Sequence, residues 1–201
     1  MTFRISPTTI DRWTQPRCKS GRHYFCVHAT KTVEQKEVTA EFAWEIDHIN
    51  LLTVVDENGN AQVLEVTDVH PFWVVTDEPD WERAAREYVN GAWHHNLAPT
   101  ENGFWVEAKD LREGDVFLGA NGELSTLVAK ERIELEESIT VYNFMVDGNH
   151  NYFVIAVEDE FGQTCILVHN ADTWWDWLFG KPKPKKVDPN SYQALVGTGP
   201  G

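Results

Sequence analysis

Hydrophobic and polar positions alternate in short runs along most of this chain, which is typical of β-strands. Residues 38–44 and 49–55 are rich in β-branched and aromatic side chains, and residues 57–60 (Glu-Asn-Gly-Asn) predict a hairpin turn. Further strands are expected at a spacing of roughly 8–12 residues, the pattern of an all-β domain. They cover 63–67, 72–75, 104–108, 116–118, 125–133, 140–146, 152–157 and 164–168.

One segment departs from this pattern. Within residues 77–90, Trp81, Ala84 and Tyr88 recur at helical spacing, Asp77 is able to cap the start, and Asn-Gly follows at the end. The sequence therefore predicts one helix inserted near 77–90, packing Trp81 and Tyr88 against the sheet.

The two ends of the chain differ from its middle. Residues 1–35 are polar and show no sustained period, and we expect them to be poorly structured or degenerate. After Asn170 a Trp-rich cluster precedes Lys-Pro-Lys-Pro-Lys-Lys, which is typical of an extended linker. We therefore divide the chain into this N-terminal segment, a domain at 36–171, and a flexible tail at 172–201.

Composition excludes several classes of function. The formal net charge of −15 argues against nucleic-acid binding, because phosphates would be repelled. No signal peptide and no apolar run long enough to span a membrane are expected; the sequence leaves the localisation open, cytoplasmic as given. The three cysteines are too few for a disulfide framework, and His94-His95 lacks a carboxylate or cysteine at ligand spacing. We expect no cofactor and no metal.

The end of the last expected strand contains residues that could carry out a self-cleavage reaction. The sequence Thr-Cys-Ile-Leu-Val-His-Asn-Ala places His169 and Asn170 at a strand end, followed by Ala171. If held in a near-attack geometry, the Asn170 carboxamide can attack its own backbone carbonyl, close a succinimide and expel the amine of Ala171. An adjacent imidazole can supply the proton. His-Asn also fits the ordinary end of a strand.

Two other histidine motifs extend this possibility. His150 lies in a turn between two expected strands, and pairing of those strands as a hairpin would bring it beside His169. Thr67 and His70, three residues apart before a proline, can hydrogen-bond one peptide group from two sides. Taken singly, His150 also fits a solvated turn and His70 a structural corner.

The order and spacing of these motifs resemble the Hint superfamily, and more narrowly the pretoxin Hint and bacterial intein-like domains of large polymorphic-toxin-type proteins. The resemblance covers about residues 36–171 and implies a Hint-type β-fold that processes its own polypeptide. The matching motifs are Thr-x-x-His-Pro-Phe at 67–72, Trp-Val-Glu-Ala-x-Asp-Leu-x-x-Gly-Asp at 105–115, Val-Tyr-Asn-Phe and His-Asn-Tyr-Phe-Val within 141–154, and Leu-Val-His-Asn at 167–170.

The resemblance also implies a role for each catalytic residue. Thr67 and His70 would activate a peptide bond preceding an N-terminal cysteine. His150 would be the later histidine of the family, His169 the penultimate histidine, and Asn170 the residue that cyclises.

Three departures from the family pattern bear on function. Asn143 stands where inteins often carry aspartate, and Ala171 offers no hydroxyl or thiol to accept a transferred chain, so cleavage without ligation is implied. The opening Cys-Phe-x-x-Gly-Thr block is not found, which means that either the opening strands are lost or the chain is a fragment of a longer protein. The nearest cysteine, Cys26, is either a vestigial nucleophile or an incidental thiol.

Three hypotheses follow. In the first, the domain cleaves itself once after Asn170 and releases a C-terminal segment, or the toxin part of a larger parent protein. In the second, it is a non-catalytic, degenerate Hint module that connects or displays neighbouring segments. The third, a hydrolase acting on external substrates, lacks a serine or cysteine nucleophile motif.

Overall fold

The fold consists almost entirely of antiparallel strands. The computed structural model describes residues 34–89, 92–94, 102–120, 122–146, 151–154, 165–169, 185–186 and 193–196. Within these ranges the one helical element is the short 3-10 helix η1 (Ala108–Asp110). The strands are β1 (Glu34–Asp56), β2 (Ala61–Val66), β3 (Pro71–Val74), β4 (Glu87–Val89), β5 (Ala92–His94), β6 (Phe104–Glu107), β7 (Val116–Leu118), β8 (Leu124–Val146), β9 (Asn151–Val154), β10 (Ile166–His169), β11 (Lys185–Lys186) and β12 (Gln193–Val196).

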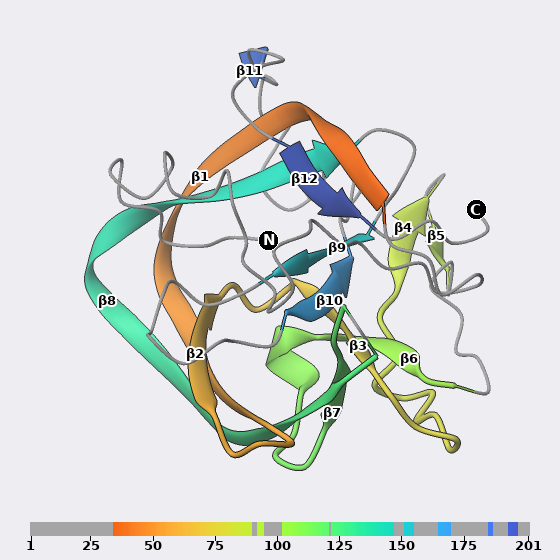
Figure 1. Cartoon of the computed structure of the whole chain (residues 1–201). Coiled ribbons are helices and arrows are strands. Elements are labelled where there is room, and N and C mark those ends of the chain that lie inside the picture. Colours follow the sequence, from red (N-terminus) through yellow and green to blue (C-terminus); the bar gives the residue numbers. More distant parts are fainter. Residues whose placement is uncertain are drawn as a thin grey trace.

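The strand pairings close on themselves. The main sheet has the order β10-β9-β12-β1-β8-β7-β3-β6, and β10 also pairs with β3, so the path returns to its start. β2 and β11 pair with β1 from outside this path, and β4 and β5 form a separate hairpin. In Figure 1 the long strands β1 and β8 curve around the shorter strands, with β9 and β10 near the centre of the view.

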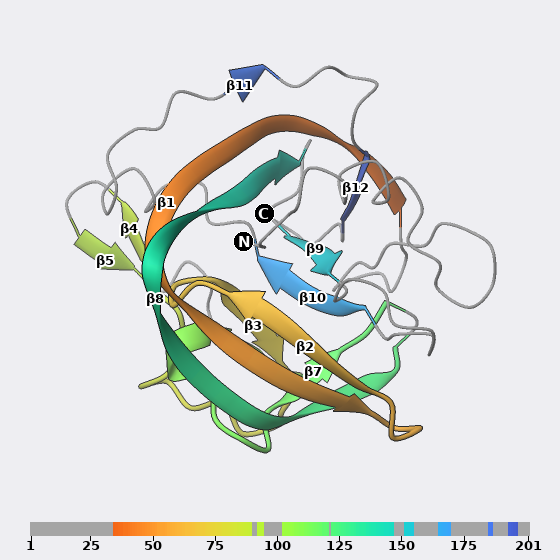
Figure 2. The same cartoon turned by 90° about the vertical axis from the view of Figure 1, so that its left-hand side faces the viewer.

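Two long strands form the frame of the molecule. β1 and β8 pair from Val38↔Val146 to Asp56↔Ser125, with register shifts at three places along β1. Such irregularities bend a two-stranded ribbon and increase its twist. Figure 2 shows the result, two curved strands that wrap around the smaller ones. The sequence predicted two strands in each of these regions, and pairing continues across the polar residues that separated them.

The hairpin between β1 and β2 forms where the sequence predicted it. The Asp56 carboxylate accepts backbone hydrogen bonds from Asn58 and Asn60, at 2.8 and 2.9 Å, and a side-chain bond from Asn60 at 2.8 Å. Gly59 has a φ of 83°, which favours glycine. The turn residues thus fix the register of β2, whose inward positions are buried and outward positions exposed.

The inside of the ring is apolar. The largest cluster of buried side chains comes from the long strands β1 and β8, from the short strands β2, β3, β6, β7, β9 and β10, and from the segments between them. It comprises Leu52, Val54, Leu64, Val66, Phe72, Val74, Ala84, Phe104, Val106, Ala108, Leu111, Phe117, Leu127, Tyr152, Val154, Ile166 and Val168. The all-β prediction is confirmed.

The prediction of a helix near 77–90 is wrong. Residues 77–86 form turns and an isolated bridge between Ala84 and Val106, and β4 follows at Glu87. The Ala85 N–H donates to the Trp105 carbonyl at 2.8 Å, so the backbone bonds to β6 instead of to itself. Ala84 and Ala85 belong to different buried clusters, as expected for neighbours in an extended segment. Trp81 is 56% exposed and does not pack into the sheet as expected.

The tail contributes strands to the main sheet. β11 and β12, both within the segment predicted to be flexible, pair with β1. Residues 1–33 lie outside the described residues, so the poorly structured N-terminal segment and the boundaries of the domain stay predictions.

Candidate functional site

The Thr-x-x-His motif forms a buried corner between β2 and β3. Thr67 is 4% exposed and His70 is fully buried. Two backbone bonds from η1 hold the corner: the Ala108 N–H donates to the His70 carbonyl at 2.9 Å, and the Lys109 N–H donates to the Asp68 carbonyl at 2.8 Å. Two of the sequence motifs, which are far apart in the chain, therefore meet at this corner.

The side chain of Asp68 ties the same corner to the two long strands. Its carboxylate accepts a hydrogen bond from the buried Asn50 amide on β1 at 2.7 Å. The His48 Nε2 lies 3.1 Å from the carboxylate, and the Arg132 Nε on β8 lies 3.6 Å from it. Sequence reasoning missed Asp68, because its partners lie on other strands and no local pattern identifies them.

The His70 imidazole lies in apolar surroundings. Its ring centroid is 5.7 Å from that of Phe72, which it meets edge-on, and 6.4 Å from that of Tyr152. Neither ring nitrogen has a hydrogen-bond partner in the described part of the chain. Burial lowers the pKa of His70 well below its usual value, and the neighbouring His169 lowers it further. The ring is therefore neutral at pH 7, with one nitrogen able to donate and the other to accept.

Tyr152 connects this histidine to a buried amide. The Tyr152 hydroxyl donates to the Asn143 Oδ1 at 3.3 Å, and both residues are buried. Asn143 stands at the position where the resemblance leads us to expect aspartate in inteins. The neutral amide accepts the tyrosine hydrogen bond without placing a charge in the core.

The last site residue within the described ranges is His169, the final residue of β10. It is partly exposed, and its ring meets Trp105 edge-on at 5.1 Å between centroids. β10 pairs with β3 through Val168↔Phe72 and with β9 through His169↔Asn151. Thr67 and His70 thus lie in the corner directly before β3, and His169 ends the adjacent strand β10.

The other predicted site residues lie outside the described residues. They are Cys26, His150, Asn170 and Ala171.

The Gly-Asp end of the second motif has a structural function. The Asp115 carboxylate accepts two hydrogen bonds from the Arg83 guanidinium, at 3.1 and 2.5 Å, and one from the Arg112 backbone N–H at 2.7 Å. Gly114 adopts a φ of 93° in this turn. These contacts hold the turn before β7 in place.

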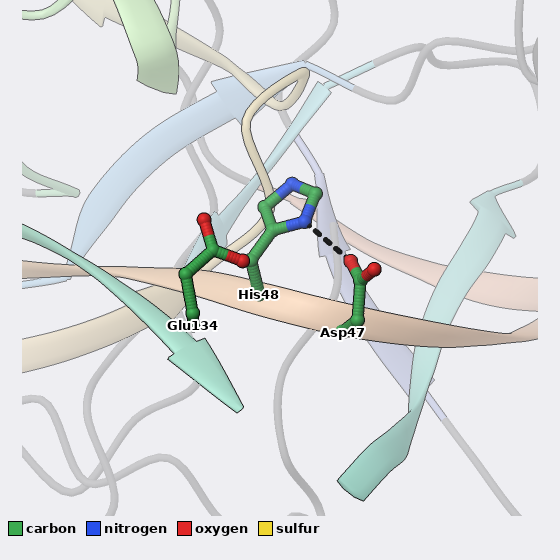
Figure 3. Close-up of side chains that lie close together, drawn as sticks. All are labelled: Asp47, His48 and Glu134. Atoms are coloured by element: carbon green, nitrogen blue, oxygen red, sulfur yellow. Dashed lines mark hydrogen bonds and ion pairs between the residues drawn. The ribbon is translucent and has the colours of Figure 1, made fainter. Parts of the chain in front are cut away.

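One group of side chains elsewhere has the residue types of a cation site. Asp47, His48 and Glu134 each offer a ligand atom, and these atoms lie within 4.8 Å of one another (Figure 3). However, the His48 Nδ1 lies 2.7 Å from Asp47 while its Nε2 faces Asp68, and Glu134 is paired with Arg132. We interpret this cluster as the outer part of the network that holds Asp68.

Comparison with known proteins finds a matching family and a similar solved structure. Residues 87–171 match the Pretoxin HINT domain family. Among solved structures, the chain is similar to the bacterial intein-like domain from Clostridium thermocellum, with a TM-score of 0.50 and 23% sequence identity, over 84% of this chain and 94% of that one. The comparison with curated proteins finds no match.

The two matches agree with the geometry. The structural likeness concerns the fold, and the family match includes the second motif, β9, β10 and the His169-Asn170 pair. Within the described residues, no helix is long and apolar enough to cross a membrane. Residues 87–171 are therefore similar to a pretoxin Hint domain, and the fold of the chain is similar to that of an intein-like domain.

Proposed function

We propose that this domain cleaves its own backbone once, after Asn170, by cyclisation of the asparagine side chain. The Asn170 Nδ2 attacks the carbonyl carbon of the same residue and loses a proton. The peptide C–N bond to Ala171 breaks, and the departing amine takes up a proton. The products are a chain ending in a C-terminal succinimide and a segment beginning with Ala171.

The observation that carries this proposal is the register of β9 and β10. The pairs run from Ile166↔Val154 to His169↔Asn151. Continued by one residue, this register would put Asn170 opposite His150. Directly opposed residues of an antiparallel pair have Cα atoms roughly 4.5–5.5 Å apart. His150 would then be close enough to act on the scissile peptide, with His169 next to it in the chain.

We assign to these two imidazoles the protonation of the leaving amine and the polarisation of the carbonyl. An amide nitrogen is a poor nucleophile, so its attack needs a held geometry and a donor for the leaving amine. His169, at the rigid end of β10, can give the proton, and His150 can polarise the carbonyl.

Thr67 and His70 have a different assignment. In the family they would act on a bond that precedes an N-terminal cysteine. In this sequence the nearest candidate for a vestige of that cysteine is Cys26. We propose that in this chain their buried corner supports the end of β10.

The outcome would be cleavage without ligation. Ala171 offers neither oxygen nor sulfur to accept an acyl group. Because the matched family consists of pretoxin domains, we further propose that the parent is a larger protein whose C-terminal part is severed from the domain backbone by this cut.

Intact-mass spectrometry of the purified chain over days at neutral pH tests this function. A fragment ending at Asn170, or its succinimide, is expected from the natural sequence and from an Asn190→Ala control. Asn170→Ala should abolish the cut. A cut that persists in Asn170→Ala would reject cyclisation.

A non-catalytic Hint module is the second candidate. The lack of the Cys-Phe-x-x-Gly-Thr opening block in the sequence favours it, since positioning of the reacting groups needs an intact supporting structure. A chain that stays uncut for days, and whose cooperative melting transition shows that it is folded, would support this alternative.

A further inference from the structure

We propose that the segment following the cleavage site is a docked strand of the fold, and that it stays bound noncovalently after the chain is cut. The strand is β12, which lies between β9 and β1 in the main sheet (Figure 1). The inference rests on the proposed function only in assuming that the domain itself makes the cut after Asn170.

The register gives β12 partners on both sides. Its four residues pair with the start of β1, from Glu34↔Val196 to Glu37↔Gln193. On the other side Val196 pairs with Tyr152 of β9. β11 adds two pairs with β1, at Ala40 and Glu41.

Without β12 the ring of strands would open. Within the described part of the chain, β9 and β1 are joined only through β12, and residues 34–37 of β1 pair with no other strand. Loss of β12 would leave the backbone N–H and C=O groups of two strand edges without partners. Exposed edges of this kind promote pairing with other chains. The docked strand thus completes the sheet that carries β9 and the neighbouring β10.

Charge favours the same docking. Residues 172–201 contain four lysines and three aspartates, whereas the whole chain has a net charge of −15. The tail is therefore slightly basic and the remainder strongly acidic. The backbone register sets Lys185 opposite Glu41. Complementary charge of this kind favours association of the two parts.

Cleavage changes how the strand is held. In the intact chain a linker connects residue 170 to β12, so docking is intramolecular with an effective concentration on the order of millimolar. After the cut the same backbone pairing becomes a bimolecular strand addition, and its occupancy depends on protein concentration. We expect the two fragments to remain together at high concentration and to separate on dilution.

Hydrogen exchange of the intact chain tests the docking. Neighbouring residues of a strand direct their N–H groups to opposite sides, so Ala194→Pro and Leu195→Pro, made separately, remove a donor on each side of β12. At least one should raise amide exchange in residues 34–37 at least tenfold, whereas Thr198→Pro, outside the strand, should not. Unchanged exchange at 34–37 in both strand variants would overturn the docking.

A protease site inserted after Gly180 tests retention independently of self-cleavage. After digestion, native size-exclusion chromatography at high concentration should elute both fragments together, and dilution should separate them. Separate elution at every concentration would overturn retention. Because the added protease makes the cut, this outcome is distinct from a failure of Asn170 to cyclise.

Discussion

The buried imidazole of His70 makes the free energy of unfolding depend on pH. Burial, with a smaller effect of His169, lowers its pKa in the folded state, whereas in the unfolded chain it titrates near pH 6.5. As the pH falls below about 6.5, the unfolded state binds a proton that the folded state does not, so the free energy of unfolding decreases. Above that pH the contribution of His70 to stability is complete.

The variant His70→Gln should therefore lose less stability on acidification than the natural chain. Urea unfolding between about pH 7.5 and pH 5 measures this, and the two curves should run parallel above about pH 7. NMR of the natural chain should show a His70 ring that stays neutral where free histidine is protonated. Identical pH dependence of the two proteins would contradict this account.

Asp68 is expected to position the Thr67–His70 corner. Replacing it with alanine leaves the buried Asn50 amide without its acceptor, which costs about 1–3 kcal/mol. The expected result is a lower urea midpoint together with a shifted NMR signal of the His70 ring. Glu65→Ala, on the neighbouring strand β2, is the control and should leave the His70 signal in place. An unmoved His70 signal in Asp68→Ala would assign Asp68 to stability alone.

At the level of elements, one glycine decides whether β6 can lie against β3. Gly103 has a φ of 148°, and a Cβ there would lie 2.3 Å from the Val74 carbonyl oxygen and 2.9 Å from the Trp73 ring. Since Val74 is paired with Phe104, its backbone cannot withdraw without breaking the ladder. Gly103→Ala should therefore cost more than about 2 kcal/mol of the free energy of unfolding.

The hairpin glycine provides a matched control for this prediction. Gly59 also has a positive φ, of 83°, but a Cβ there meets nothing within 4 Å. Gly59→Ala should cost only the conformational strain, about 1 kcal/mol. Equal urea midpoints for the two variants would show that the contact with Val74 is relieved in some other way.

Local patterns predicted most strands, because alternation and turn residues act within a few positions. The hairpin at 57–60 and the strands at 152–157 and 164–168 were predicted on that basis. The segment at 77–90 was not, since its helical spacing is overruled by hydrogen bonds to β6, which local sequence does not encode. β12 was missed for a similar reason: four residues of a polar tail become a strand only because β1 and β9 offer them edges.

The same contrast applies to the site. Thr67, His70 and His169 were predicted as site residues from their motifs; in the structure the first two lie directly before β3, and His169 ends the adjacent strand β10. Asp68 and Tyr152 were not identified as site residues, because their importance comes from contacts between strands that are distant in sequence.

At the scale of the whole molecule, the ring of strands links the site to both ends of the described chain. β10, which ends at His169, pairs with β3 beside the buried corner and with β9. β9 in turn contacts β12, which comes from beyond the proposed cleavage site. The proposed cut therefore falls within the connection between two strands of one ring, and its consequence is a change in how that ring is held together.

The charge of the whole molecule gives the last prediction. With a net charge of −15, long-range repulsion opposes the compact state, and salt screens it over a Debye length that falls from about 10 Å at 0.1 M to about 3 Å at 1 M. The free energy of unfolding should therefore rise with NaCl. Replacing the exposed Glu136 and Glu137 of β8 with glutamine should stabilise the fold at low salt and lose that effect at 1 M. Urea unfolding of both proteins at the two salt concentrations measures this, and a natural chain that loses stability in salt would show that local ion pairs such as Arg83–Asp115 outweigh the overall repulsion.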